Sequence, residues 1–120
     1  MKKIFSYSSL LLLLSLANLL PIQLSATTST LDSCLLQLKK YNQDTLSLSF
    51  CQLLTTTGES YAEEEYFVIA SSYYQRALAI AKTENFAALT LKNNINLGAA
   101  YFWTSEYNKG INHLQAALEI

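Results

Sequence analysis

Glycine and proline are scarce in this chain: three Gly and one Pro occur among its 120 residues. Strands and tight turns need these residues at their corners, so their scarcity argues against a β architecture. Leucine and alanine are frequent instead, and both favour helices. The length allows one domain at most. We therefore expect an all-α fold.

The overall composition narrows the class of protein further. Apolar residues make up 51% of the chain, which excludes an intrinsically disordered protein. The net charge is −1, so no basic field exists to attract nucleic acid. We therefore expect no nucleic acid among the partners.

The N-terminal segment, residues 1–26, has the three-part layout of a secretory signal peptide. Lys2 and Lys3 form a positive start, an uncharged leucine-rich run ends at Leu20, and Ala26 is a small residue suited to cleavage. We therefore expect residues 1–26 to direct export across the membrane, so that the protein is periplasmic or secreted.

Three other interpretations of the N-terminal segment stay open. The segment can remain as a membrane anchor, because the uncharged run from Ile4 to Leu20 is at the short limit for a bilayer span. It can also be a buried core helix. The third is a lipid-modification motif ending at Cys34, which the charge of Asp32 and the distance from the leucine run oppose.

Two cysteines, Cys34 and Cys51, would meet an oxidising compartment after export. Apolar residues at helical spacing predict helices over 31–41 and 45–55, and the polar break between them places the two thiols level across a hairpin. We therefore expect a disulfide that closes the loop between these cysteines and contributes about 3 kcal/mol. The alternative is two buried free thiols. Two cysteines and one distant histidine make no zinc site.

Residues 94–120 carry small and large side chains at a fixed spacing. Leu97, Gly98 and Tyr101 form its first part, and Gly110 and Ala117 lie in its second. This pattern resembles the tetratricopeptide repeat, W-x2-L-G-x2-Y followed by A-x3-F and a later alanine. Asn94 stands where the tryptophan is expected. Six positions take the places of the repeat skeleton, with leucine replacing the aromatic residue at the fifth: Leu97, Gly98, Tyr101, Gly110, Leu114 and Ala117.

The two glycines of this segment have a physical reason of their own. A glycine inside a helix costs about 1 kcal/mol relative to alanine. Gly98 and Gly110 lie in successive predicted helices, so we expect them to mark the place where the two backbones approach closely.

The resemblance implies stacked antiparallel helical hairpins, a short solenoid, in which the first helix of each pair lines a peptide groove. Ile95 and Ala99 occupy the places of the lysine and asparagine with which some members of the family hold a terminal carboxylate. We therefore expect an apolar-aromatic groove for an extended or helical peptide. Alternatively, Phe102 and Trp103 pack on a following helix. The implied groove residues are Lys92, Ile95, Asn96, Ala99, Phe102 and Trp103.

An earlier copy of the pattern is weaker and has two interpretations. Gly58, Tyr61, Ala70 and Tyr74 repeat the spacing that the later copy shows from Gly98 to Leu114. Alternatively, Ser60 to Glu63 forms a capping box that starts a helix at Tyr61, with Glu63 to Glu65 in its first turn. We favour the capping box, which makes 55–60 a loop.

The predicted helices are 31–41, 45–55, 61–82, 86–103 and 106–120. The last of them stops in the middle of the pattern, so Leu118 and Ile120 would face solvent at the uncovered edge of the last helix. We expect residues 27–120 to be a repeat domain that is incomplete at its C-terminus, or one that forms a homodimer through this edge.

Few side chains are suited to catalysis or to metal binding. His113 is the only histidine, and its helical position predicts a solvated side chain. We expect no catalytic residues, no cofactor and no metal site. The sequence therefore favours an exported, non-catalytic scaffold that binds a protein or peptide. The alternatives are the regulatory front of a longer exported enzyme, such as a protease, and a small membrane-tethered protein.

Overall fold

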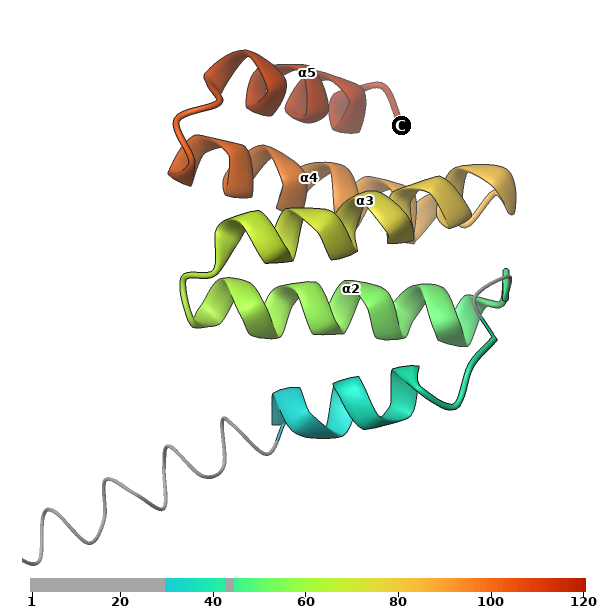
Figure 1. The fold of residues 1–120 in the computed structure, drawn as a ribbon. Helices are drawn as coiled ribbons and strands as arrows, with labels where there is room; N and C mark the ends of the chain where they lie inside the picture. Colours follow the sequence, from blue (N-terminus) through green and yellow to red (C-terminus); the bar gives the residue numbers. More distant parts are fainter. Residues whose placement is uncertain (1–29, 43–44) are drawn as a thin grey trace, which may run out of the picture. The chain divides into compact units, whose positions relative to one another are not determined.

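The computed structural model describes residues 30–42 and 45–120, and over these residues the only regular structure is helix. This confirms the all-α class. The chain divides into two units at Asp32, and nearly all described residues belong to the second, Ser33–Ile120. The predicted signal peptide lies outside the described residues. The helices are the segment 30–38, α2 (Leu48–Glu63), α3 (Phe67–Thr83), α4 (Ala87–Trp103) and α5 (Tyr107–Leu118) (Figure 1).

Helix α2 runs through the region for which a loop was expected. It begins after Ser47, whose hydroxyl accepts a hydrogen bond of 3.1 Å from the Phe50 N–H, and it ends at Glu63. The predicted loop at 55–60 and the predicted helix start at Tyr61 are therefore wrong, whereas α3 occupies the rest of the predicted helix 61–82. The three acidic residues from Glu63 lie at the end of α2 and in the following turn, not in the first turn of a helix.

Polar side chains inside α2 find their partners within the helix. The hydroxyls of Thr55, Thr57 and Ser60 each donate to the carbonyl oxygen four residues earlier, at 2.7–3.1 Å. A hydroxyl satisfied in this way does not need to compete with the helix for backbone groups. Ser60 is therefore an ordinary helical residue, and it does not start a new helix.

Gly58 has a packing role in the middle of α2. A Cβ atom at this position would lie 2.6 Å from the Tyr74 ring and 3.2 Å from the Ala70 carbonyl oxygen. Only a residue without a side chain lets α2 and α3 approach so closely. The favoured interpretation of Gly58 as a loop residue is therefore corrected.

The hairpin of α4 and α5 repeats this contact. A Cβ atom on Gly98 would lie 2.6 Å from Leu114 and 3.3 Å from the Gly110 carbonyl oxygen. In the sequence, Gly98, Leu114 and Gly110 have the same spacing as Gly58, Tyr74 and Ala70. The repeated spacing thus describes the contacts of both hairpins, and the favoured capping box at Ser60 is wrong.

Three turns of one type connect α2 to α5. Glu65, Asn85 and Ser105 have positive φ angles of 66°, 59° and 63°, and they are evenly spaced along the chain. In each turn the next residue donates its N–H to the carbonyl oxygen five residues earlier, at 2.8–3.0 Å. This is the Schellman ending of a helix, which favours glycine at the left-handed position.

We expect Ser105→Gly to stabilise the protein by about 0.5–1 kcal/mol, because glycine removes the cost of a left-handed L-residue. Urea unfolding followed by circular dichroism measures the change. Gln115→Gly is the control: Gln115 is exposed inside α5, and there glycine should destabilise by about 0.5–1 kcal/mol. Equal effects of the two substitutions would contradict the argument.

The helices enclose two neighbouring groups of buried side chains. In Figure 1, α2 to α5 follow one another in space in chain order. The first group joins α2, α3 and the start of α4, and the second joins α3 and α4. The first consists of Phe50, Cys51, Leu54, Ala77, Ala81 and Leu89, and the second of Ala70, Tyr74, Leu78, Leu97, Ala100 and Tyr101.

Candidate functional site

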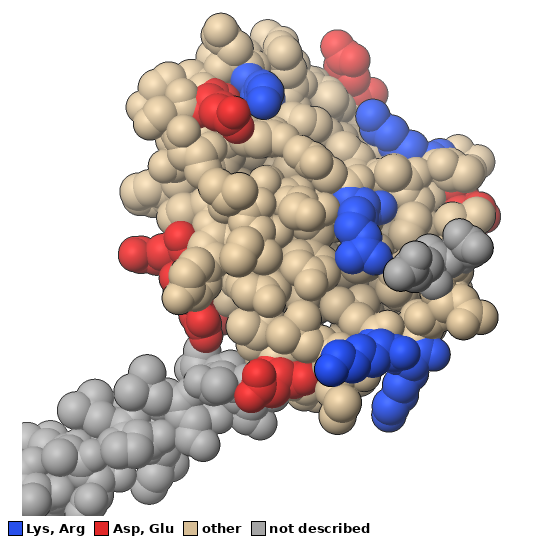
Figure 2. All heavy atoms as spheres, in the orientation of Figure 1, with Lys and Arg blue, Asp and Glu red and all other residues tan. Residues whose placement is uncertain are grey.

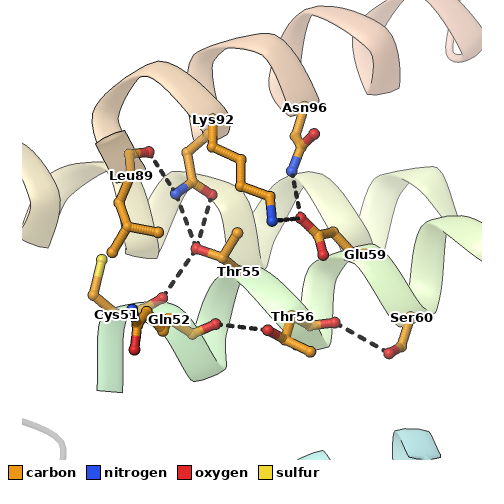
Figure 3. Close-up of polar contacts among 10 residues, drawn as sticks. Cys51, Gln52, Thr55, Thr56, Glu59, Ser60, Leu89, Lys92 and Asn96 are labelled. Atoms are coloured by element: carbon orange, nitrogen blue, oxygen red, sulfur yellow. Dashed lines mark hydrogen bonds and ion pairs between the residues drawn. The ribbon is translucent and has the colours of Figure 1, made fainter. Parts of the chain in front are cut away.

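The predicted groove residues lie on α4, where the structure divides them between two sides of the helix. One side faces α2 and carries Lys92 and Asn96. Both side chains meet Glu59 of α2: the Lys92 ammonium lies 2.9 Å from its carboxylate, and the Asn96 amide donates to it at 3.2 Å (Figure 3). Both groups therefore brace α4 against α2 and are not free for a ligand.

A shallow hollow of about 210 Å³ continues this side towards the end of α4. The Trp103 ring stacks on the Phe67 ring at a centroid distance of 5.5 Å. Burial and the negative charges of Glu59 and Glu63 raise the pKa of Tyr74, which also lines the hollow, to about 12. The lining residues are Ala62, Phe67, Tyr74, Asn96, Ala99, Ala100 and Trp103, so three predicted groove residues come together here.

The other side of α4 carries Ile95 and Phe102, which are both exposed. The Phe102 ring lies 5.6 Å from the Tyr107 ring and close to Gly110, so this side adjoins α5. Leu91 is exposed one turn before Ile95. The six predicted residues therefore do not form one continuous groove.

A buried polar pair lies between α2 and α4, and it was not among the sequence predictions. The Asn93 amide donates to the Thr55 hydroxyl and to the Leu89 carbonyl oxygen, both at 2.9 Å. The Thr55 hydroxyl donates in turn to the Cys51 carbonyl oxygen at 3.0 Å (Figure 3). An asparagine in a largely apolar helix was the available signal, because a buried amide needs a polar partner.

The expected disulfide is not formed in the structure. Cys34 and Cys51 are both buried, and both are free thiols. The Cys51 thiol donates to the Ala77 carbonyl oxygen of α3 at 3.2 Å, so its sulfur is directed to a different helix from the one expected. Burial raises the pKa of the Cys51 thiol, which keeps it protonated and makes it a poor nucleophile.

His113 is partly buried, which corrects its predicted solvation. Its Nδ1 lies 3.0 Å from the Asn94 side-chain oxygen, and its ring stacks on Tyr101 at a centroid distance of 5.6 Å. Burial, together with the positive charge of Lys82, lowers the pKa of His113. The imidazole therefore ties α5 to α4 as a neutral group.

Charged side chains are sparse on the face drawn in Figure 2, most of which is neither basic nor acidic. Within residues 30–42 and 45–120, no three acidic, histidine or cysteine side chains converge on a point that could hold a metal ion. None of the described helices combines the length and the apolar character that crossing a membrane requires.

No protein-family model matches the sequence, and no curated protein or solved structure is significantly similar to it. The resemblance to tetratricopeptide repeats therefore rests on the residues of this chain alone.

Proposed function

We propose that this protein is a non-catalytic helical-repeat scaffold, and that it binds an amphipathic helix of a partner protein on the side of α4 and α5 that no other described helix covers. One observation carries the proposal: four apolar residues on this side are exposed, although three of them have counterparts in the preceding hairpin that are buried against α4. We call them the end face: Leu91, Ile95, Phe102 and Leu118.

Three positions of the first hairpin show how α4 covers such a face. Cys51 packs in one group with Leu89 of α4, Thr55 bonds to Asn93 of α4, and Leu78 packs in one group with residues of α4. Their side chains are 0%, 1% and 6% exposed.

The correspondence that matches Gly58 with Gly98 assigns these three positions to Leu91, Ile95 and Leu118, which are 39%, 46% and 87% exposed. All three are large apolar side chains, and exposed apolar residues gathered on one side of a helical hairpin mark interaction sites. The end face is thus as apolar as a surface buried between helices, but no described helix packs on it.

A helix is the occupant that this surface favours. The element on the corresponding surface of the first hairpin is α4, which presents Leu89, Asn93 and Leu97 at helical spacing. Amphipathic helices bind apolar grooves through anchors at the same spacing. The resemblance to tetratricopeptide repeats supports a scaffold of this kind, and the N-terminal pattern supports action after export.

The test uses a fluorescently labelled peptide with the sequence of residues 85–104, which contains α4. We expect it to bind the full chain in an anisotropy titration. Ile95→Asp and Leu118→Asp should each weaken binding by at least about tenfold, because a carboxylate would lose its hydration under the peptide. Both side chains are exposed, so neither substitution should unfold the protein.

Val68→Asp is the matched control, since Val68 is an exposed apolar residue on α3 outside the end face. It should leave binding unchanged. Equal binding by all variants would contradict the proposal. A concentration-dependent dimer in sedimentation that Leu118→Asp abolishes would show that a second copy occupies the end face, and would overturn the assignment to a partner helix.

A further inference from the structure

A second hollow lies at the opposite end of the described helices, and nothing in the proposed scaffold function uses it. Its volume is about 500 Å³, within the usual size of small-molecule sites. It is bounded by the segment after residue 34, by α2 and by α3. The lining residues are Leu35, Leu38, Lys39, Tyr41, Phe50, Tyr73 and Arg76.

The floor of this hollow is aromatic. The rings of Tyr41 and Phe50 lie 5.1 Å apart, and Phe50 belongs to the buried core. Tyr73 packs against the same core and stacks on Tyr61 at 5.5 Å. These rings are held by their neighbours, so an apolar ligand would meet a preformed surface at little cost in side-chain entropy.

The rim is cationic. Lys39 and Arg76 both line the hollow, and both side chains are exposed. Neither takes part in an ion pair within the described part of the chain, whereas Lys92 and Lys109 do. The Arg76 guanidinium lies 5.7 Å from the centre of the Tyr73 ring, which directs it over the aromatic floor. No described acidic residue lines the hollow.

From these features we infer that the hollow binds a small organic acid with an apolar body, whose carboxylate meets Lys39 and Arg76 while its hydrocarbon part covers the rings. Arginine recognises a carboxylate through paired N–H donors, and its charge is most effective beside a surface that excludes water. A neutral molecule of the same shape would leave both cations without a partner.

The test is a fluorescence titration of the full chain with anilinonaphthalene sulfonate, an aromatic anion. We expect Arg76→Gln and Lys39→Gln each to weaken dye binding by about two- to fivefold, and the double variant to weaken it further. Lys109→Gln is the control, since Lys109 is a surface cation on α5. All variants keep the N-terminal segment unchanged, so dye bound there cancels in the comparison.

Competition identifies the ligand class. Decanoate should displace the dye at concentrations at which decanol displaces little. Equal displacement by the two compounds, or a double variant that binds like Lys109→Gln, would overturn the inference. Loss of dye binding in Leu118→Asp would place the dye on the end face and would also overturn it. An unchanged titration in Leu118→Asp separates this site from the proposed scaffold function.

Discussion

Leu97→Ala is expected to destabilise the protein by about 2–5 kcal/mol, as large-to-small changes in a close-packed core do. Leu97 is fully buried in the group that joins α3 to α4, where it packs with Tyr74, Leu78 and Tyr101. Removing its branched end leaves a cavity that the two helices cannot fill without moving. Urea unfolding followed by circular dichroism measures the loss.

Leu91→Ala is the matched control, since Leu91 is a partly exposed leucine on the same helix. It should change the free energy of unfolding by less than about 0.5 kcal/mol. Leu97→Met, which conserves volume, should cost less than about 1.5 kcal/mol. A similar loss in Leu97→Ala and Leu91→Ala would show that Leu97 does not lie in the core.

Gly110→Val is expected to destabilise the hairpin of α4 and α5 by about 1–3 kcal/mol through overpacking. A Cβ atom at this position would lie 3.0 Å from the Gly98 carbonyl oxygen and 3.2 Å from the Phe102 ring. A backbone oxygen cannot turn aside as a flexible side chain does, so the two helices must separate. Thermal unfolding provides the measurement.

Asn112→Val controls for the β-branched side chain, because Asn112 is exposed on the same helix. It should shift stability by only a few tenths of a kcal/mol, as helix propensity dictates. A second comparison concerns Gly98, whose added Cβ would meet the Leu114 side chain at 2.6 Å. Gly98→Ala and Leu114→Ala should therefore couple by at least about 0.5 kcal/mol. Additive effects would contradict the contact.

The second hairpin was predictable because its sequence signals agree with its packing. Helices at 86–103 and 106–120 were expected, and α4 and α5 occupy these segments. The glycines at 98 and 110 do mark the close approach of the two helices. The two glycines whose positions inside helices needed a packing reason are thus the residues that define the contact.

The first hairpin was not predictable in the same way, because a local capping signal in its sequence competes with a packing contact between distant residues. Ser60 and Glu63 have the spacing of a capping box, but Gly58 fits against Tyr74 only if α2 continues through it. Tertiary packing then overrides the local preference. The expected disulfide is absent for a different reason: helical spacing placed Cys34 level with Cys51 but did not fix where the sulfur points, and the Cys51 thiol bonds to Ala77 of α3.

The candidate site was predictable only in part. Helical spacing brought Asn96, Ala99 and Trp103 to one hollow. It gave no information on Glu59, which holds Lys92 and Asn96 from another helix. A contact between α2 and α4, which the whole of α3 separates along the chain, depends on how the helices cross. The pattern within one helix does not contain it.

The buried pair of Thr55 and Asn93 has a consequence for how α4 can be placed. Sliding α4 along α2 by one helical turn, about 5.4 Å, would bring Leu89 or Leu97 opposite Thr55. Either shift would place a leucine there, since Leu89 and Leu97 lie four residues on each side of Asn93. The amide of Asn93, however, would be buried with one partner fewer, which costs about 1–3 kcal/mol. The hydrogen-bonded pair thus favours a single alignment of α4 along α2.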